Sequence, residues 1–343
     1  MTEAKILGNP ERKSSIDDLL KRAGKDSVVQ GALRKKDEKP QKKTKQKQKK
    51  HLGKVIGLEE VGRFIHPIPP NHLDGVSFHP NGKHVITSCY GDGLKVFEFD
   101  PTFSGHGGFT LVNSYGEEKC HIRKVAFSPD GKKLAVAIGD YIDILGFDES
   151  GLSRVYKTGF NKAKCQSNIY GMAFSPDGKE LAVVSMDCYL RIFRIDKSNL
   201  RGIAERKHTP GPHEVAFSPN GKRIITGNLS HELYMFSRHN LDDGPVKLSD
   251  IASSVRGISF NPDNRNEFVV ASGELVGYHR GYLEICRFDN NYDKMLQMEP
   301  VFKKDFEREL RGVSFGKNGY IAVVGEDRCL RVFEVMREEN AGA

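Results

Sequence analysis

The chain of 343 residues contains no tryptophan and no long apolar run. No window approaches the roughly 18 consecutive apolar residues of a membrane-spanning helix, so the sequence predicts no membrane span. The N-terminus, MTEAKILGNPERKSS, lacks a basic stretch followed by an apolar one. We therefore expect a protein that is not secreted and that works in the nucleus or the cytoplasm.

Cysteine pairs and catalytic motifs are also missing. None of the six cysteines forms a C-x-x-C pair, and several stand inside apolar strand patterns. Without a secretory signal they are interpreted as reduced thiols, with no structural zinc and no other metal. The chain has no Ser-His-Asp order, no phosphate-binding glycine loop and no HExxH helix, so we expect no cofactor and no enzymatic activity.

The net charge of +8 belongs to one short segment. Residues 34–50, RKKDEKPQKKTKQKQKK, carry a net charge of +8, whereas residues 51–343 carry −1. The basic residues of this run are Arg34, Lys35, Lys36, Lys39, Lys42, Lys43, Lys45, Lys47, Lys49 and Lys50. Like charges and a low apolar content predict a disordered tail over residues 1–50, and residues 339–343 are also expected to be disordered.

Three functions fit the basic run. It is a nuclear or nucleolar address, a weak RNA contact through counterion release, or a solvated arm. No aromatic residue interrupts the run to stack on bases. Within the tail, residues 15–23 predict a short helix, because Ser15 and Asp18 fit a capping box. So short a helix is marginal alone; either it is not formed or it folds onto a partner.

From residue 72 the chain repeats one pattern six times, as in KVAFSPDGKKLAVA (124–137) and GMAFSPDGKELAVV (171–184). The anchor phenylalanines of the six copies are Phe78, Phe127, Phe174, Phe217, Phe260 and Phe315. Each copy predicts a short apolar strand that ends at the phenylalanine, a tight turn, an alternating second strand and a third strand. A looser segment, such as FTLVNSY or GPVKLSD, can supply a fourth strand before the next copy.

Six copies of four antiparallel strands predict an all-β fold, a six-bladed β-propeller over residues 51–338. The last copy lacks an outer strand, and residues 54–68 can provide one. We expect this N-terminal strand to close the ring and hide the free edges. Seven blades are less favoured, since a seventh would need about 40 more residues.

The turn FSPDGKxL and the third strand L-R-[IV]-F resemble the WD-repeat family over residues 54–336. Phenylalanine replaces the family's tryptophan, at Phe97, Phe193, Phe236 and Phe333. The family's Gly-His pair is also missing at its usual place, although His72, His121 and His213 precede three inner strands. The resemblance implies a non-enzymatic protein-interaction scaffold, which we expect to be a monomer within a complex. The basic run, in turn, predicts a nuclear or ribonucleoprotein link.

Two alternatives stay open. One is a propeller subunit of a coat or trafficking assembly, which could be open and could accept a partner's strand. The other is a six-bladed propeller that resembles either the TolB-like proteins, through its SPDGK turns, or the lactonases. In a lactonase-like propeller a channel metal would act as a Lewis acid.

Aligned repeats also single out one position, four residues before each anchor phenylalanine. It is occupied by Asp74, Arg123, Tyr170, His213, Arg256 and Arg311, which we call the ring residues. In WD-repeat relatives this level surrounds the channel mouth on the top face and grips partner peptides. Three arginines, a tyrosine and a histidine there suit an acidic or phosphorylated peptide. Alternatively, the arginines pair with the turn aspartates Asp92, Asp140, Asp187 and Asp327, expected on the same rim, and tie neighbouring blades together.

Two insertions break the period, at residues 101–108 and 273–281. Loops longer than the minimum are where binding tends to concentrate. The histidines of these loops, His106 and His279, are interpreted as plain solvent-exposed residues.

Overall fold

The computed structural model describes residues 53–67, 72–89, 91–103, 106–115, 122–148, 151–153, 165, 167–196, 199–208, 210–274, 279–288 and 298–338. The predicted disordered tail over residues 1–50, its helix and its basic run lie outside the described residues, as do residues 339–343 and His121. No helix among the described residues is both long and apolar enough to cross a membrane.

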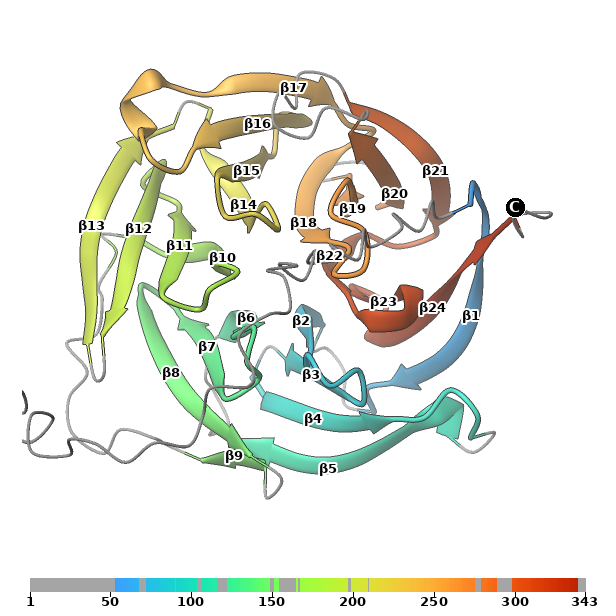
Figure 1. The fold of residues 1–343 in the computed structure, drawn as a ribbon. Coiled ribbons are helices and arrows are strands. Elements are labelled where there is room, and N and C mark those ends of the chain that lie inside the picture. The colour runs from blue at the N-terminus through green and yellow to red at the C-terminus, as the bar shows by residue number, and fades with distance from the viewer. Residues whose placement is uncertain are drawn as a thin grey trace, which may run out of the picture. The chain divides into compact units, whose positions relative to one another are not determined.

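Six four-stranded antiparallel sheets surround a central axis and form a six-bladed β-propeller (Figure 1). Blade 1 contains β2 (Leu73–Phe78), β3 (His84–Cys89), β4 (Gly93–Phe99) and β5 (Phe109–Tyr115). Blade 2 contains β6 (Ile122–Phe127), β7 (Lys133–Ile138), β8 (Tyr141–Asp148) and β9 (Gly151–Ser153). Blade 3 contains β10 (Ile169–Phe174), β11 (Glu180–Ser185), β12 (Tyr189–Asp196) and β13 (Asn199–Lys207).

The other three blades repeat this order. Blade 4 contains β14 (Pro212–Phe217), β15 (Arg223–Asn228), β16 (Glu232–Ser237) and β17 (Val246–Asp250). Blade 5 contains β18 (Ser254–Phe260), β19 (Glu267–Gly273), β20 (Gly281–Phe288) and β21 (Met298–Phe306). Blade 6 contains β22 (Leu310–Phe315), β23 (Tyr320–Gly325), β24 (Cys329–Arg337) and β1 (Val55–Ile65). Short 3₁₀ turns lie at His106–Gly108, Leu241–Asp243 and Lys317–Gly319.

The N-terminal strand closes the ring, which confirms the prediction. β1 pairs antiparallel with β24 from Val55 opposite Arg337 to Ile65 opposite Cys329, and the two strands lie side by side in Figure 1. Blade 6 is therefore built from both ends of the propeller sequence. The outer strand position that an open propeller would offer to a partner is occupied by this chain's own β1.

The repeated turn has the conformation that the sequence predicts. Gly131, in the turn between β6 and β7, has a φ of 72°, a value that glycine adopts without steric cost. Asp130 fixes the turn, because its carboxylate accepts hydrogen bonds from the Ser128 hydroxyl at 2.6 Å and from the Lys132 backbone N–H at 3.1 Å. Ser175 and Asp177 repeat the first of these contacts in blade 3.

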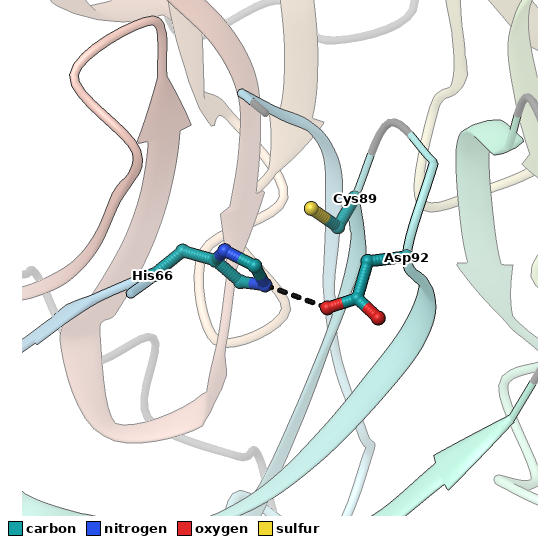
Figure 2. A group of neighbouring side chains, drawn as sticks. All are labelled: His66, Cys89 and Asp92. Carbon is teal, nitrogen blue, oxygen red and sulfur yellow. Dashed lines mark hydrogen bonds and ion pairs between the residues drawn. The ribbon is translucent and has the colours of Figure 1, made fainter. Parts of the chain in front are cut away.

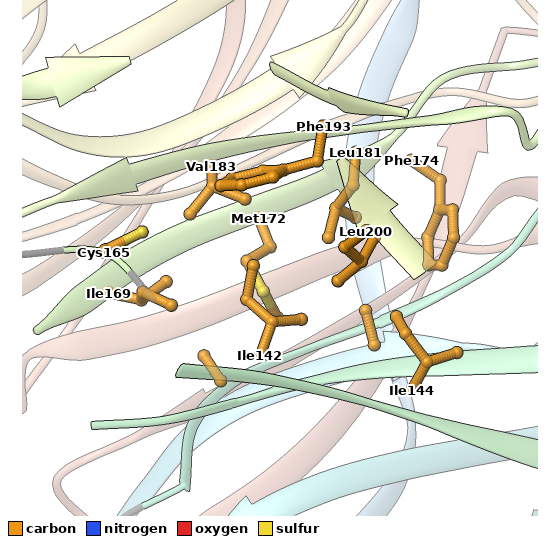
Figure 3. Close-up of a cluster of buried hydrophobic side chains, with 12 residues drawn as sticks. Ile142, Ile144, Cys165, Ile169, Met172, Phe174, Leu181, Val183, Phe193 and Leu200 are labelled. Atoms are coloured by element: carbon orange, nitrogen blue, oxygen red, sulfur yellow. The ribbon is translucent and has the colours of Figure 1, made fainter. Parts of the chain in front are cut away.

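The hydrophobic core lies between blades, in six clusters that are each shared by two neighbours. Along β11, Leu181 and Val183 face blade 2, in the cluster drawn in Figure 3, whereas Ala182 and Val184 face blade 4. Successive side chains of a strand point to opposite faces, and both faces of this strand are covered. This is why the second strand of each repeat is an almost continuous apolar run.

Serine hydroxyls join some of the inner strands. The backbone N–H of Phe127 donates to the Ser77 hydroxyl at 3.1 Å, which joins blade 2 to blade 1. Blades 5, 6 and 1 are joined in the same way through Ser259 and Ser314. In blades 2, 3 and 4 alanine holds the corresponding position.

Candidate functional site

Each ring residue is the extra residue of a β-bulge. The innermost strand of every blade has a register shift against its second strand, and in each blade the shift falls at the ring residue. In blade 1, for example, Leu73 pairs with Cys89 and Gly75 with Ser88, which leaves Asp74 without a partner. A bulge bends the strand and re-aims a side chain. The six bulges therefore place the ring residues at one face of the propeller, which we call the ring face.

Arg123, Tyr170 and His213 contact one another in order around blades 2, 3 and 4. The guanidinium carbon of Arg123 lies 5.5 Å from the centre of the Tyr170 ring, a cation–π distance. The Tyr170 and His213 rings are stacked, with centroids 4.4 Å apart and planes 17° apart. Side chains from three blades thus form one continuous row.

His213 continues the row to blade 5. Its Nε2 lies 3.1 Å from Nη1 of Arg256, and because a guanidinium only donates, Nε2 is the acceptor. Burial, followed by the nearby positive charge of Arg256, holds the pKa of His213 well below its usual value. The ring is therefore neutral at physiological pH, and Nδ1 carries its hydrogen.

Arg256 and Arg311 are held by carboxylates. Nε of Arg256 lies 2.5 Å from Oε1 of Glu309, and Nη2 of Arg311 lies 2.7 Å from Oε1 of Glu326. Arg311 also approaches Asp74 at 3.5 Å, which links blade 6 to blade 1. The structure therefore brings all six ring residues together, but on this side of the ring the arginines tie blades to one another.

Below the ring residues lies an ion pair that the sequence reasoning missed. The ammonium of Lys124, in blade 2, contacts the carboxylate of Glu214, in blade 4, and their side chains are 8% and 1% exposed. The pair passes Gly171 of blade 3, where a Cβ would lie 2.8 Å from the Glu214 Cα. Burial raises the pKa of Glu214, and Lys124 opposes that shift. A contact that skips one repeat has no signal in the aligned motif.

The turn aspartates lie at the ring face but do not pair with the ring arginines. Asp187 binds Arg191 of its own blade at 2.7 Å, and Asp327 is paired with Arg331. These aspartates therefore fix their own turns. The inter-blade ties use Glu309, Glu326 and Asp74 instead.

The two insertions differ in what they contact. The loop over residues 101–108 packs against the closing strand, because a Cβ on Gly107 would lie 2.1 Å from the Arg63 carbonyl oxygen. Of the loop over residues 273–281, the structure describes 273, 274 and 279–281. His279 there lies 3.6 Å from Glu326 and has a half-exposed side chain, which places it near the ring.

His66, Cys89 and Asp92 bring three metal-ligating side chains together where β1 meets blade 1 (Figure 2). Their ligand atoms lie within 4.8 Å of one another, and residues of these types can hold a divalent metal. Asp92, however, already binds His66 at 2.9 Å and the Lys95 ammonium at 3.2 Å. Burial, followed by Asp92, raises the pKa of the Cys89 thiol to about 12. The observed contact links β1 to the neighbouring blade.

A family model, the WD domain, G-beta repeat, matches residues 159–194. Together with the six blades, this match supports the WD-repeat propeller family. A comparison with curated proteins found no match.

The departures from the WD-repeat pattern have structural explanations. Phe97, Phe236 and Phe333, at the tryptophan position of the repeat, are fully buried in their third strands. His208, which stands four residues before β14, contacts the Thr226 hydroxyl at 2.8 Å and packs on Phe236. His66 likewise contacts the turn aspartate Asp92. Both histidines stand further upstream of their inner strands than the predicted His72 and His213 do.

Proposed function

We propose that this WD-repeat propeller is a non-enzymatic scaffold whose ring face holds a segment of a partner protein. The observation that supports the proposal most is the bulge in each of the six inner strands, which directs six side chains of four residue types to one face. An anionic side chain, acidic or phosphorylated, suits the cationic members of the ring. The proposal treats the protein as a monomer within a larger complex.

Reversing the charge of Arg123 should remove partner capture without unfolding the protein. Arg123 is half-buried and its described contact is the Tyr170 ring, so Arg123→Glu changes the surface more than the core. The matched control is Lys132→Glu, an exposed residue in the turn at the other end of the same β6–β7 hairpin. Affinity purification with mass spectrometry should show proteins that Arg123→Glu loses and Lys132→Glu retains. Equal capture by both variants would contradict the proposal.

For the basic run over residues 34–50 we propose a nuclear address, with a weak RNA contact as the second possibility. Ten basic residues within seventeen support this reading. A fluorescent fusion of the full chain should be enriched in the nucleus, and deletion of residues 34–50 should abolish that enrichment. Cytoplasmic signal from both fusions would argue against the address.

Two observations bear on the coat-assembly and lactonase-like alternatives. β1 occupies the strand position that an open propeller would leave to a partner. Asp74, the acidic member of the ring, is shared with Arg311 and with His72, which lies 3.2 Å away.

A further inference from the structure

The ring has two halves of different electrostatic character. Over blades 5, 6 and 1, Arg256 and Arg311 meet the carboxylates of Glu309, Glu326 and Asp74. Over blades 2 to 4, Lys124 and Glu214 neutralise each other. In this second half, no residue that the structure describes forms an ion pair with Arg123. One half of the ring is internally neutralised, and the other keeps a positive charge that no carboxylate of the described residues compensates.

Arg123 is arranged to receive an anion. A guanidinium that lies over an aromatic ring keeps its N–H donors available in its own plane, where they match the oxygens of a carboxylate or a phosphate. The Tyr170 ring is in turn backed by His213, which is neutral. The row therefore supports Arg123 without neutralising its charge.

Exposed apolar side chains lie over the same half. Met186, in the turn after β11, is 58% exposed, and Leu229, in the turn after β15, is 36% exposed. Both turns lie at the ring face, because Ser185 pairs with Ile169 and Asn228 with Pro212, next to the ring residues of blades 3 and 4. The corresponding turn of blade 6 carries the polar residues Glu326 and Asp327.

We infer that the partner segment lies over blades 2 to 4, with an anionic side chain on Arg123 and apolar side chains on Met186 and Leu229. The inference rests on the proposed function and assigns the ring face a footprint and a ligand chemistry. The charge of Arg123 selects a phosphorylated or acidic residue, and the two exposed apolar side chains select apolar neighbours in the same segment.

Degenerate peptide pools can test this chemistry on the immobilised full-length protein. Three pools share random flanks and carry a central phosphoserine, glutamate or serine. The phosphoserine and glutamate pools should be retained at least about tenfold better than the serine pool. Tenfold corresponds to about 1.4 kcal/mol, which one hydrogen bond to a charged group can contribute. Which of the two is retained better identifies the anion. Bound peptides should also be enriched in apolar flanks.

Variants separate the two parts of the footprint. Arg123→Gln should reduce the retention of the phosphoserine and glutamate pools to that of the serine pool, whereas Lys132→Gln should leave their retention unchanged. The double variant Met186→Ser/Leu229→Ser should no longer enrich peptides with apolar flanks but should still prefer the anionic pools. Met336→Ser changes an exposed apolar residue on β24 and should alter neither preference. Equal retention of all three pools, or equal effects of Arg123→Gln and Lys132→Gln, would overturn the inference.

The peptide pools test the inferred ligand chemistry, whereas partner capture tests the proposed function, so failure of one can be distinguished from failure of the other. If Arg123→Glu loses its protein partners while the pools show no preference for an anion, the scaffold proposal stands and the inferred chemistry is wrong. If Arg123→Glu keeps every partner, the proposed function itself is contradicted.

Discussion

Replacing Glu214 with alanine should lower the free energy of unfolding by about 3–5 kcal/mol, the cost of leaving one charge of a buried pair uncompensated. Glu214 is 1% exposed and Lys124 is 8% exposed, so water cannot replace the lost carboxylate. The pair also crosses from blade 2 to blade 4, and its loss should loosen three blades at once. Urea denaturation of the purified protein measures the effect.

An exposed strand glutamate serves as the control. Glu205 pairs with Arg191 at 3.3 Å and is 63% exposed, and Arg191 keeps its pair with Asp187 when Glu205 is removed. Glu205→Ala should cost less than about 1 kcal/mol, as exposed pairs do. The double variant Lys124→Met/Glu214→Gln removes both charges and should recover much of the loss. If Glu214→Ala and Glu205→Ala have similar free energies of unfolding, the stabilising role of the buried Lys124–Glu214 pair is contradicted.

The sequence could predict the blades and the ring positions because both depend on local patterns. Each phenylalanine ends its inner strand, and each bulge lies at the same offset from it, so Arg123 and His213 align although their blades are separate. The residues that specify a tight turn and the two strands beside it lie within about a dozen positions of one another in the sequence. The closing strand could be predicted from the shortage of strands in the last repeat.

The charge partners of the ring could not be predicted in this way. Glu309 precedes β22 and Glu326 follows β23, but the repeat does not mark either position as acidic, since the aligned residues include His72 and Met186. Lys124 and Glu214 occupy the position where four other blades have glycine, and their contact depends on the empty space at Gly171. These pairings are set by the closure of the ring, which brings together residues of different repeats. They determine which ring arginine has no carboxylate partner among the described residues.

The second large effect concerns β1, whose removal should destabilise the whole propeller. A variant that begins at residue 67 loses the outer strand of blade 6 and uncovers the edge of β24. It also loses four apolar side chains. Val55 is buried, and Leu58 and Val61 pack against the hydrophobic clusters of blade 6. The ring of Phe64 lies 4.7 Å from the ring of Phe97. At about 1.5–3 kcal/mol for each fully buried large apolar side chain, we expect a loss of roughly 6 kcal/mol.

The control for this truncation is a variant that begins at residue 51, which keeps β1. Its melting temperature should stay close to that of the full chain, whereas the variant beginning at residue 67 should melt at least about 10 °C lower or aggregate through its free edge. A synthetic peptide of residues 53–67 should restore the melting temperature when added in excess, because it can pair with β24. Equal melting of the two truncated chains, or no response to the peptide, would show that the ring does not depend on closure by β1.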